Sequence, residues 1–253
     1  MVKIYSFLDV EKIRQSGKIL AEVFEILKKE IQIGVSLKYL DDLAYKVIKE
    51  KGARPAFLGY RPGGAKNPYR ASICASVNNV IVHGFPGNYK LQSGDVLKID
   101  CGVKYKNFYS DAAFTAIVGK GTKEKENLIK ATKDALDEAI KYAKPGSHLG
   151  NIGWAIERIA EKFGVKAVEE LTGHGIGRDL HEDPTIYNYG EKGKGIELKT
   201  GMVLAIEPMF SSGSDRIIQL PDESWATSDG SLSAHFEHTV AIAEKGAVVL
   251  TSL

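Results

Sequence analysis

Four acidic residues and one histidine stand in segments whose pattern predicts strands. Asp100 ends "GDVLKID", Asp111 lies in "YSDAAFTAIVG", Glu207 ends "GMVLAIE" and Glu237 lies in "SAHFEHTVAIA". His174 lies between two glycines in "TGHGIG", which let the backbone and a ligand approach closely. Burying a carboxylate without a partner costs several kcal/mol or removes its charge. Each acid on a buried strand therefore requires a partner.

The segment around Asp100 and Asp111 predicts a hairpin. With its turn at Tyr105 and Lys106, the two aspartates would be direct cross-strand neighbours with Cβ atoms roughly 5 Å apart. Two carboxylates that close repel each other unless a proton or a cation lies between them. Lys98, on the same face as Asp100, could be that cation. A divalent metal ion is the alternative that the further acids favour.

The five residues together have the chemistry of a metal centre. Four carboxylates and one imidazole suit two hard or borderline divalent ions. Two such ions about 3.5–4 Å apart can bridge and deprotonate one water and polarise a carbonyl group. The sequence therefore predicts a hydrolytic site. Co, Mn, Fe, Ni and Zn are all compatible with these ligands, so the identity of the metal stays open.

The helices and strands that position these residues are predicted from hydrophobic periodicity and from glycine and proline stop signals. Helical spacing and stop signals predict helices over 9–30, 37–51, 123–143 and 149–163. The rest is predicted to be mostly strand, with loops at 187–196 and 211–231. Along the strand at 96–101, alternation places Leu97, Ile99 and Cys101 against the core and Asp100 on the opposite face.

The order of helices and strands occurs twice, which indicates an internal repeat. "GDVLKID" (94–100) matches "GMVLAIE" (201–207), and His83-Gly-Phe-Pro matches His181-Glu-Asp-Pro. We therefore expect one domain over 1–253, built from two halves at approximately 9–121 and 122–250. In this repeat Asp100 corresponds to Glu207.

Composition narrows the class of protein. The chain has 34 Lys+Arg against 32 Asp+Glu, a net charge of +2, which argues against sequence-specific nucleic-acid binding. Two cysteines make no disulfide framework. We expect neither a signal peptide nor a membrane span, and therefore a cytoplasmic protein.

These motifs resemble methionine aminopeptidase. The resemblance covers nearly the whole chain and includes Asp100, Asp111, "GHGIG", "HEDP", "AIEPM" and "SAHFEHT". It implies the α+β pita-bread fold, with two pseudo-symmetric α/β halves around a curved antiparallel sheet. Only 26 residues separate His181 from Glu207, which leaves no room for the helical insertion of the type II enzymes. The chain is therefore similar to type I, and we expect no N-terminal extension.

The resemblance implies a role for each residue of the centre. Asp100 would hold one metal ion, His174 the other, and Asp111 and Glu237 would bridge both. Glu207 would be a ligand on the His174 side and would also carry a proton from the attacking water to the leaving amine. The substrate's free α-amine would coordinate the ion on the Asp100 side.

The resemblance also implies that two further histidines contact the substrate. His83 would contact the scissile amide nitrogen, and His181 would donate a hydrogen bond to the carbonyl oxygen as charge develops there.

A methionine pocket should be apolar with soft contacts to the thioether. The matching positions are Phe57, Tyr60, Tyr69, Cys74, Leu180 and Trp225. The sequence departs from commoner type I patterns in four ways. Phe57 stands where a cysteine is frequent, Leu180 stands where an aromatic is common, the loop from Tyr60 to Cys74 is longer than usual, and the segment between Trp225 and Glu237 is slightly short.

The implied activity is metal-dependent removal of the initiator methionine from nascent proteins and peptides whose second residue is small. We expect two divalent ions, transient contact with the ribosome and a monomeric protein. Two alternatives stay open: an X-Pro peptidase of the same fold, and a pita-bread binding protein without catalysis.

Overall fold

The computed structural model describes residues 2–61 and 66–252. Within these ranges the helices are α1 (Phe7–Glu30), α2 (Leu37–Glu50), α3 (Lys123–Tyr142) and α4 (Leu149–Phe163). They confirm the helices predicted from the sequence, with ends shifted by at most two residues. The side chain of Ser36 caps α2 by accepting from the backbone N–H of Tyr39, and Gly164 ends α4 in the left-handed conformation.

Most strands of the described chain belong to one antiparallel sheet. Its order is β1-β4-β5-β14-β9-β7-β8, with β2 added on β4 and β15 on β14. The bounds are β1 (Arg54–Pro55), β2 (Cys74–Val77), β4 (Val96–Tyr105), β5 (Phe108–Ile117), β7 (Thr172–Gly175), β8 (Glu182–Tyr187), β9 (Val203–Ile206), β14 (Glu237–Ala243) and β15 (Gly246–Val249).

Two small sheets flank this main sheet within the described residues. One has the order β13-β10-β6 and the other β11-β12-β3. Their bounds are β3 (Val80–Val82), β6 (Lys166–Ala167), β10 (Met209–Ser211), β11 (Ile217–Gln219), β12 (Trp225–Thr227) and β13 (Ser233–His235). The hairpin of β11 and β12 corrects the loop predicted over 211–231. Its short strands lack the long apolar alternation that identified the others.

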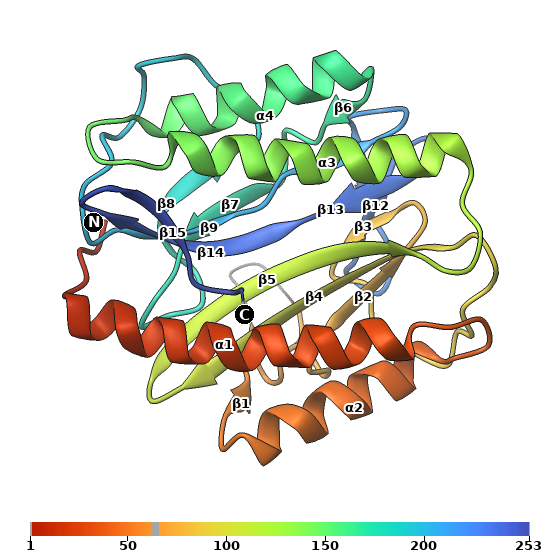
Figure 1. Cartoon of the computed structure of the whole chain (residues 1–253). Coiled ribbons are helices and arrows are strands. Elements are labelled where there is room, and N and C mark those ends of the chain that lie inside the picture. The colour runs from red at the N-terminus through yellow and green to blue at the C-terminus, as the bar shows by residue number, and fades with distance from the viewer. Residues whose placement is uncertain (1, 62–65, 253) are drawn as a thin grey trace.

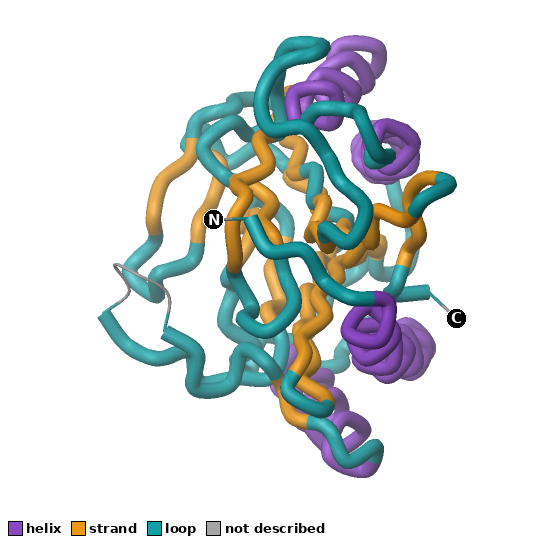
Figure 2. Tube along the Cα trace, turned by 90° about the vertical axis from the view of Figure 1, so that its left-hand side faces the viewer, coloured by secondary structure: helices purple, strands orange, loops and turns teal. Residues whose placement is uncertain are grey.

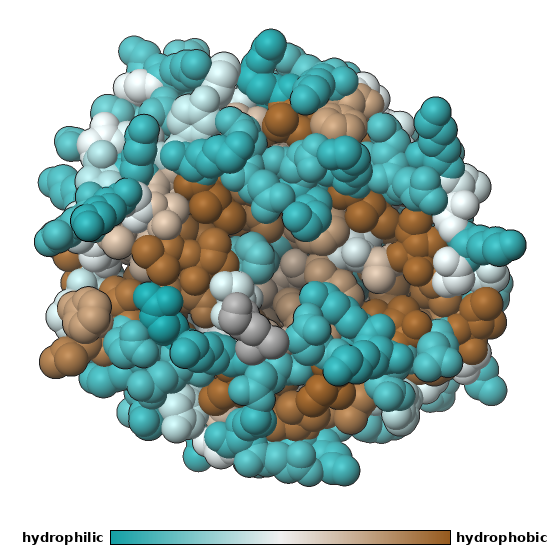
Figure 3. Space-filling model, in the orientation of Figure 1, coloured by the Kyte–Doolittle hydropathy of each residue, from teal (hydrophilic) through white to brown (hydrophobic). Residues whose placement is uncertain are grey.

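The helices lie together on one side of the main sheet, and long loops lie on the other (Figures 1 and 2). Leu97, Ile99 and Cys101 of β4 pack with α1 and α2 in one core cluster, as alternation predicted. A second cluster joins α3 and α4 to β9 and β14. Hydrophilic side chains cover most of the outer helix surfaces (Figure 3). This layering confirms the α+β pita-bread fold.

The structure corrects the predicted hairpin register. β4 and β5 pair Asp100 with Ala113 rather than with Asp111. The turn lies at Lys106 and Asn107, whose φ values of 48° and 63° fit a tight hairpin turn. Because the register moves by two residues, both aspartates stay on the same face and become diagonal neighbours.

The two halves of the chain meet where β5 pairs with β14. Backbone pairing places Glu237 opposite Ala113. Beside this pair, the hydroxyl of Thr239 accepts from the backbone N–H of Asp111 at 2.9 Å and donates to its carbonyl oxygen at 2.7 Å. A side chain thus takes the place of a backbone partner at this junction.

We keep the division into repeats at 9–121 and 122–250 as a proposal. It is supported by the parallel roles of β4 and β9, since Asp100 lies in the middle of β4 and Glu207 directly follows β9. Gly94 and Gly201, which precede these strands, have similar left-handed φ values of 89° and 92°.

Helix α1 crosses the C-terminal segment too closely for a side chain at Gly17. A Cβ atom there would overlap the backbone carbonyl of Leu250. Alanine in a helix gains about 1 kcal/mol over glycine, whereas overpacking a core costs ~1–3 kcal/mol. The overlapping atoms belong to the backbone and cannot move aside as a flexible side chain can, so the upper end of this cost applies. We therefore expect Gly17→Ala to lower the melting temperature by about 3 °C or more in thermal unfolding.

The matched control is Gly87→Ala, because a Cβ atom at Gly87 meets no atom within 4 Å. Its unfolding free energy should change by less than about 0.5 kcal/mol. A Gly17→Ala protein as stable as the parent would contradict the close packing of α1 on the C-terminal segment.

Candidate metal centre and active site

All the residues that the sequence singled out for chemistry or binding line one cavity. Its volume is about 1240 Å³. The thirteen predicted residues on its wall are Phe57, Tyr60, Tyr69, Cys74, His83, Asp100, Asp111, His174, Leu180, His181, Glu207, Trp225 and Glu237. The cavity exceeds the size usual for a small-molecule site, which leaves room for more than one residue of a peptide.

The sheet register builds a row of acids on the face away from the helices. Asp100 of β4 pairs with Ala113 of β5, and Ala113 pairs in turn with Glu237 of β14. The register between β14 and β9 then brings Glu207, directly after β9, beside Glu237. Since neighbouring strands are about 4.8 Å apart, the small side chain of Ala113 leaves an open space between carboxylates.

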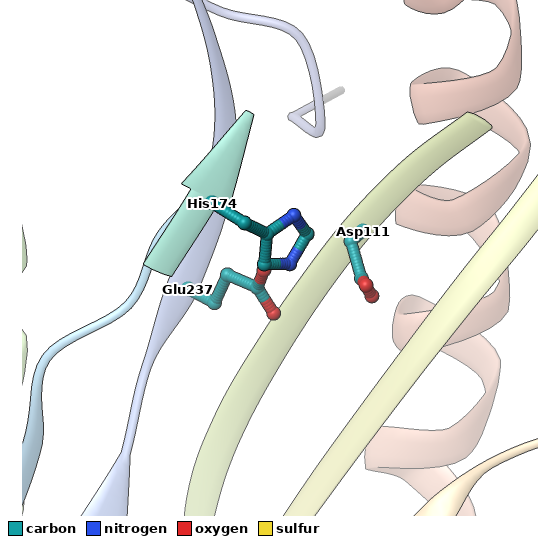
Figure 4. Close-up of side chains that lie close together, drawn as sticks. All are labelled: Asp111, His174 and Glu237. Carbon is teal, nitrogen blue, oxygen red and sulfur yellow. The ribbon is translucent and has the colours of Figure 1, made fainter. Parts of the chain in front are cut away.

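Asp111 and His174 complete the centre from neighbouring positions. Asp111 pairs with Gly102, and His174 pairs with Ala205. One donor atom each from Asp111, His174 and Glu237 lies within 4.8 Å of the other two. Figure 4 shows these three side chains, from three strands, directed into the same space. Such a group has the size needed to surround one ion.

Glu207 lies between two histidines. Its Oε1 is 3.6 Å from His174 Nε2, and its Oε2 is 3.2 Å from His235 Nε2. His235 is almost fully buried, and together with Glu207 and Glu237 it forms a second group of donor atoms within 4.8 Å. The hydroxyl of Thr115 holds it by bonding both its backbone N–H and its carbonyl.

Sequence reasoning missed His235. The signal was present, because His235 precedes Glu237 by two residues and strand periodicity brings such residues to one face. In contrast, the ring of His238 points elsewhere and hydrogen-bonds the hydroxyl of Thr251 at 2.8 Å.

A backbone carbonyl determines which nitrogen of His174 is free. His174 Nδ1 lies 2.9 Å from the carbonyl oxygen of Gly175. A carbonyl oxygen can only accept, so Nδ1 carries the hydrogen and Nε2 has a free lone pair in the neutral ring. That lone pair faces the acids, and this arrangement is typical of histidines that bind metals.

Burial changes the ionisation of the whole cluster. Desolvation raises the pKa of Asp100 to about 7, with His235 opposing and Glu207 adding to the rise. Desolvation also raises the pKa of Glu207 to about 7, against the effect of His174. The pKa values of Asp111 and Glu237 lie well above the usual range, because burial comes first and neighbouring carboxylates add repulsion.

Unsatisfied atoms at the centre fit a bound cation. Asp100 Oδ1 and Glu237 Oε1 are buried without a hydrogen-bond partner. Lys98 is not that partner. Its ammonium group is fully buried and donates to the backbone carbonyls of Asn78, Val96 and Ser233 at 2.7–3.3 Å. Oxygen and imidazole donors with unused lone pairs are what divalent ions require.

His83 and His181 face the cavity from outside the acidic row. His83 has a left-handed φ of 61°, which is uncommon for a residue with a side chain. Desolvation, with a contribution from His235, lowers the pKa of His83 to about 4. Desolvation, followed by His174 and His83, lowers the pKa of His181 to about 3. Both rings are therefore neutral near pH 7.

The turn that carries His181 is anchored by its neighbour Glu182. The carboxylate of Glu182 accepts from the hydroxyl of Tyr5, the ammonium of Lys3 and the backbone N–H groups of Arg178 and Asp179. His181 therefore has a fixed backbone position.

The predicted apolar pocket is divided between two clusters. Phe57, Cys74 and Leu180 are buried together, with Tyr60 and Tyr69 packed against them. Trp225 instead packs with Val82 and Met209, because β12 pairs with β3. Phe85, Val82 and Met209 also line the cavity and were not predicted. Part of the long loop between Tyr60 and Cys74, residues 62–65, lies outside the described residues.

The raised carboxyl pKa values predict how the metal-free protein responds to pH. A carboxyl whose pKa rises on folding stabilises the fold fully below its unfolded pKa of about 4, and this contribution is lost as pH rises through the folded pKa. Asp100 and Glu207 place that loss between about 4 and 7, and Asp111 and Glu237 extend it upward.

We therefore expect the melting temperature of chelator-treated protein to fall by several degrees between about pH 5 and about pH 8. Adding Mn²⁺ or Zn²⁺ should largely remove this fall, because a bound cation stabilises the ionised carboxylates. Differential scanning calorimetry with and without metal measures both effects. A flat profile in the metal-free protein would contradict the crowding of buried acids.

The chain is similar to known proteins over its whole length. Residues 11–244 match the model of metallopeptidase family M24. The methionine aminopeptidase of Aquifex aeolicus is 44% identical over 259 residues, which cover 100% of this chain and 99% of that protein. A methionine aminopeptidase from Thermotoga maritima, known from its crystal structure, superposes with a TM-score of 0.95 and 40% identity, covering 100% of both chains.

More distant structures share the fold alone. Prolidase from Pyrococcus furiosus has a TM-score of 0.76 and 24% identity over 99% of this chain, but only 65% of the prolidase chain is covered. No helix in residues 2–61 and 66–252 is long and apolar enough to cross a membrane. The match over residues 11–244, together with full-length relatives of 40–44% identity, establishes that this chain belongs to metallopeptidase family M24.

Proposed function

We propose that this protein removes the N-terminal methionine from peptides and nascent proteins, with divalent metal ions as cofactors. The observation that carries the proposal is one cavity that combines a buried acidic cluster with an apolar wall. It is supported by the full-length similarity to methionine aminopeptidases. We further propose that the centre holds two ions, and that the second residue of the substrate must be small.

Five side chains would hold the ions: Asp100, Asp111, His174, Glu207 and Glu237. His174 would use Nε2, since Nδ1 donates to Gly175. Ions bound there would activate a water and polarise the scissile carbonyl. We leave the choice among Co, Mn, Fe, Ni and Zn to experiment, because the mixture of carboxylates and imidazole suits each of them.

Glu207 is the proposed proton carrier. Its carboxylate would take a proton from the attacking water and pass it to the leaving amine. His235 Nε2 lies 3.2 Å from the second oxygen of this carboxylate without a hydrogen bond to it, and the buried ring would limit the rotation of the carboxylate by contact alone. His83 would contact the scissile amide nitrogen.

The apolar wall would bind the methionine side chain. Phe57 and Tyr69 meet edge to face, with ring centroids 6.5 Å apart. Burial, followed by the nearby Asp100, raises the pKa of Cys74 well above its usual range, so its sulfur stays a neutral thiol. A neutral, polarizable surface of this kind suits a thioether. Trp225 would close the pocket from the opposite cluster.

The cavity extends past this wall, so we propose that a nascent chain enters with its amino terminus first. A transient ribosome contact, a monomeric state and a cytoplasmic location stay predictions from the sequence.

Release of the first residue from a small peptide panel tests the activity. The panel holds Met-Ala, Met-Lys, Leu-Ala and Ala-Pro amino termini, and the protein is stripped with chelator and reloaded with one metal at a time. We expect metal-dependent release of Met from the Met-Ala peptide alone, detected by mass spectrometry. Release from Ala-Pro would support an X-Pro peptidase instead. Absence of release, from folded protein that binds metal, would support a non-catalytic binding protein.

Asp111→Asn tests the centre itself. Asp111 is almost fully buried and lies in the cluster with His174 and Glu237. Loss of an outer partner of a metal ligand already costs about 10–100-fold. An amide cannot supply a negatively charged bridge, so we expect kcat to fall by about 100-fold or more while circular dichroism stays unchanged. Asp42→Asn, at an exposed site on α2, is the control and should keep full activity. Near-normal turnover by the Asp111→Asn protein would remove Asp111 from the bridging role.

A further inference from the structure

The side chain of Tyr60 meets a ring of the candidate active site rather than only lining the apolar wall. Its hydroxyl oxygen lies 2.6 Å from Nδ1 of His181. The two rings are tilted by 42°, with centroids 5.1 Å apart. The distance of 2.6 Å is at the short end of the range for hydrogen bonds donated by hydroxyl groups. Tyr60 and His181 are far apart in sequence, so only the fold brings them together.

The backbone holds Tyr60 in place independently of the loop that follows it. Its N–H donates to the carbonyl of Phe57 at 2.9 Å, and its own carbonyl accepts from Tyr69 at 2.8 Å. Gly59 donates to the carbonyl of Tyr69 at 2.8 Å. These backbone hydrogen bonds fix the position of Tyr60 and therefore the position of its side chain relative to His181.

The direction of the hydrogen bond follows from the partners. Within the described residues, His181 Nδ1 is the only hydrogen-bond partner of the Tyr60 hydroxyl. Burial raises the pKa of Tyr60, so the phenol keeps its hydrogen. A neutral imidazole nitrogen without hydrogen is a good acceptor for that hydrogen. In the Nδ1–H tautomer the phenol hydrogen would have no acceptor among the described residues, whereas donation from the O–H of Tyr60 to Nδ1 satisfies both groups and leaves Nδ1 without a hydrogen of its own.

The two active-site histidines are therefore prepared for opposite tasks. A carbonyl oxygen takes the hydrogen of His174 Nδ1 and leaves Nε2 as a lone pair. A hydroxyl donates to Nδ1 of His181 and leaves Nε2 as the N–H. The two rings touch, with centroids 4.3 Å apart. The same residue type can thus provide a metal ligand and a hydrogen-bond donor side by side.

We propose that Tyr60 is a positioning residue that holds His181 in the tautomer with hydrogen on Nε2, so that His181 can donate to a carbonyl oxygen in the cavity. This role rests on the proposed aminopeptidase function for its catalytic consequence, but the tautomer itself does not depend on that function. In the absence of the Tyr60 hydroxyl, the ring can place its hydrogen on either nitrogen, and one of these forms has no donor for the substrate.

Ring nitrogen NMR of the Zn²⁺-loaded protein tests the tautomer directly. Long-range ¹H–¹⁵N spectra distinguish the two tautomers by the chemical shifts of Nδ1 and Nε2, and His181→Gln identifies the resonances of His181. We expect the Nε2–H form in the parent and a mixture in Tyr60→Phe. Tyr69→Phe is the matched control, since its hydroxyl bonds the carbonyls of Ile73 and Gly84. It should leave the tautomer of His181 unchanged. An Nδ1–H form in the parent would overturn the proposal.

Kinetics test the consequence. On the Met-Ala peptide we expect Tyr60→Phe to lower kcat about tenfold, which corresponds to one neutral hydrogen bond, with KM within about twofold. In a His181→Gln background the same change should lower kcat less than about twofold, because an amide donates without a tautomer. Metal affinity, measured by titration calorimetry, should be equal in parent and Tyr60→Phe proteins.

Two results would overturn the positioning role. One is a double variant in which the loss of kcat equals the product of the losses in the two single variants, Tyr60→Phe and His181→Gln. The other is weaker metal binding by Tyr60→Phe, which would mean that Tyr60 acts through His174. If no variant and no parent protein released methionine, the proposed function would fail, whereas the NMR result on the tautomer would still stand or fall by itself.

Discussion

The structure is organised around the repulsion of carboxylates buried at close range. Asp100, Asp111, Glu207 and Glu237 share one desolvated space, and burial with mutual repulsion raises the pKa of each. Such a cluster is stable with protons or with cations, and near neutral pH a divalent ion is the stronger partner. The cost of burying these groups is offset by helices that pack against the other face of the same strands. Core packing and site chemistry therefore use opposite faces of one sheet.

The antiparallel sheet is the device that brings the acids together. Strand alternation separates apolar from acidic residues within each strand, and register aligns the acidic faces of neighbouring strands. The junction of β5 with β14 is decisive, because it joins the first half of the chain to the second. There the small side chain of Ala113 leaves space between Asp100 and Glu237, while Thr239 fixes the backbone of Asp111. A larger side chain at Ala113 would fill the space that an ion needs.

Around the acids, histidines make the site directional. The backbone carbonyl of Gly175 and the hydroxyl of Tyr60 assign different nitrogens of His174 and His181 to the cavity. His174 lies near one oxygen of Glu207 and His235 near the other. The Gly175 carbonyl, the Tyr60 hydroxyl and His235 exert these effects without having to contact a substrate themselves. Outer contacts of this kind tune ligands and donors strongly in metal sites. They convert a cluster of charged groups into a centre with distinct positions for metal and substrate.

The sequence by itself predicted the helices, the strand faces and five side chains that line one cavity. These depend on local periodicity, as in Leu97, Ile99 and Cys101 against Asp100, and on motifs specific enough to identify a family. Tertiary structure decided what depends on contacts distant in sequence. The turn at Lys106 and Asn107 moved the hairpin register by two residues, and the pairing of β12 with β3 placed Trp225 in a separate cluster. The ammonium group of Lys98 donates to backbone carbonyls, and the ring of His235 lies beside Glu207. The turn is local, but the partners of Trp225, Lys98 and His235 arise only when separate strands meet.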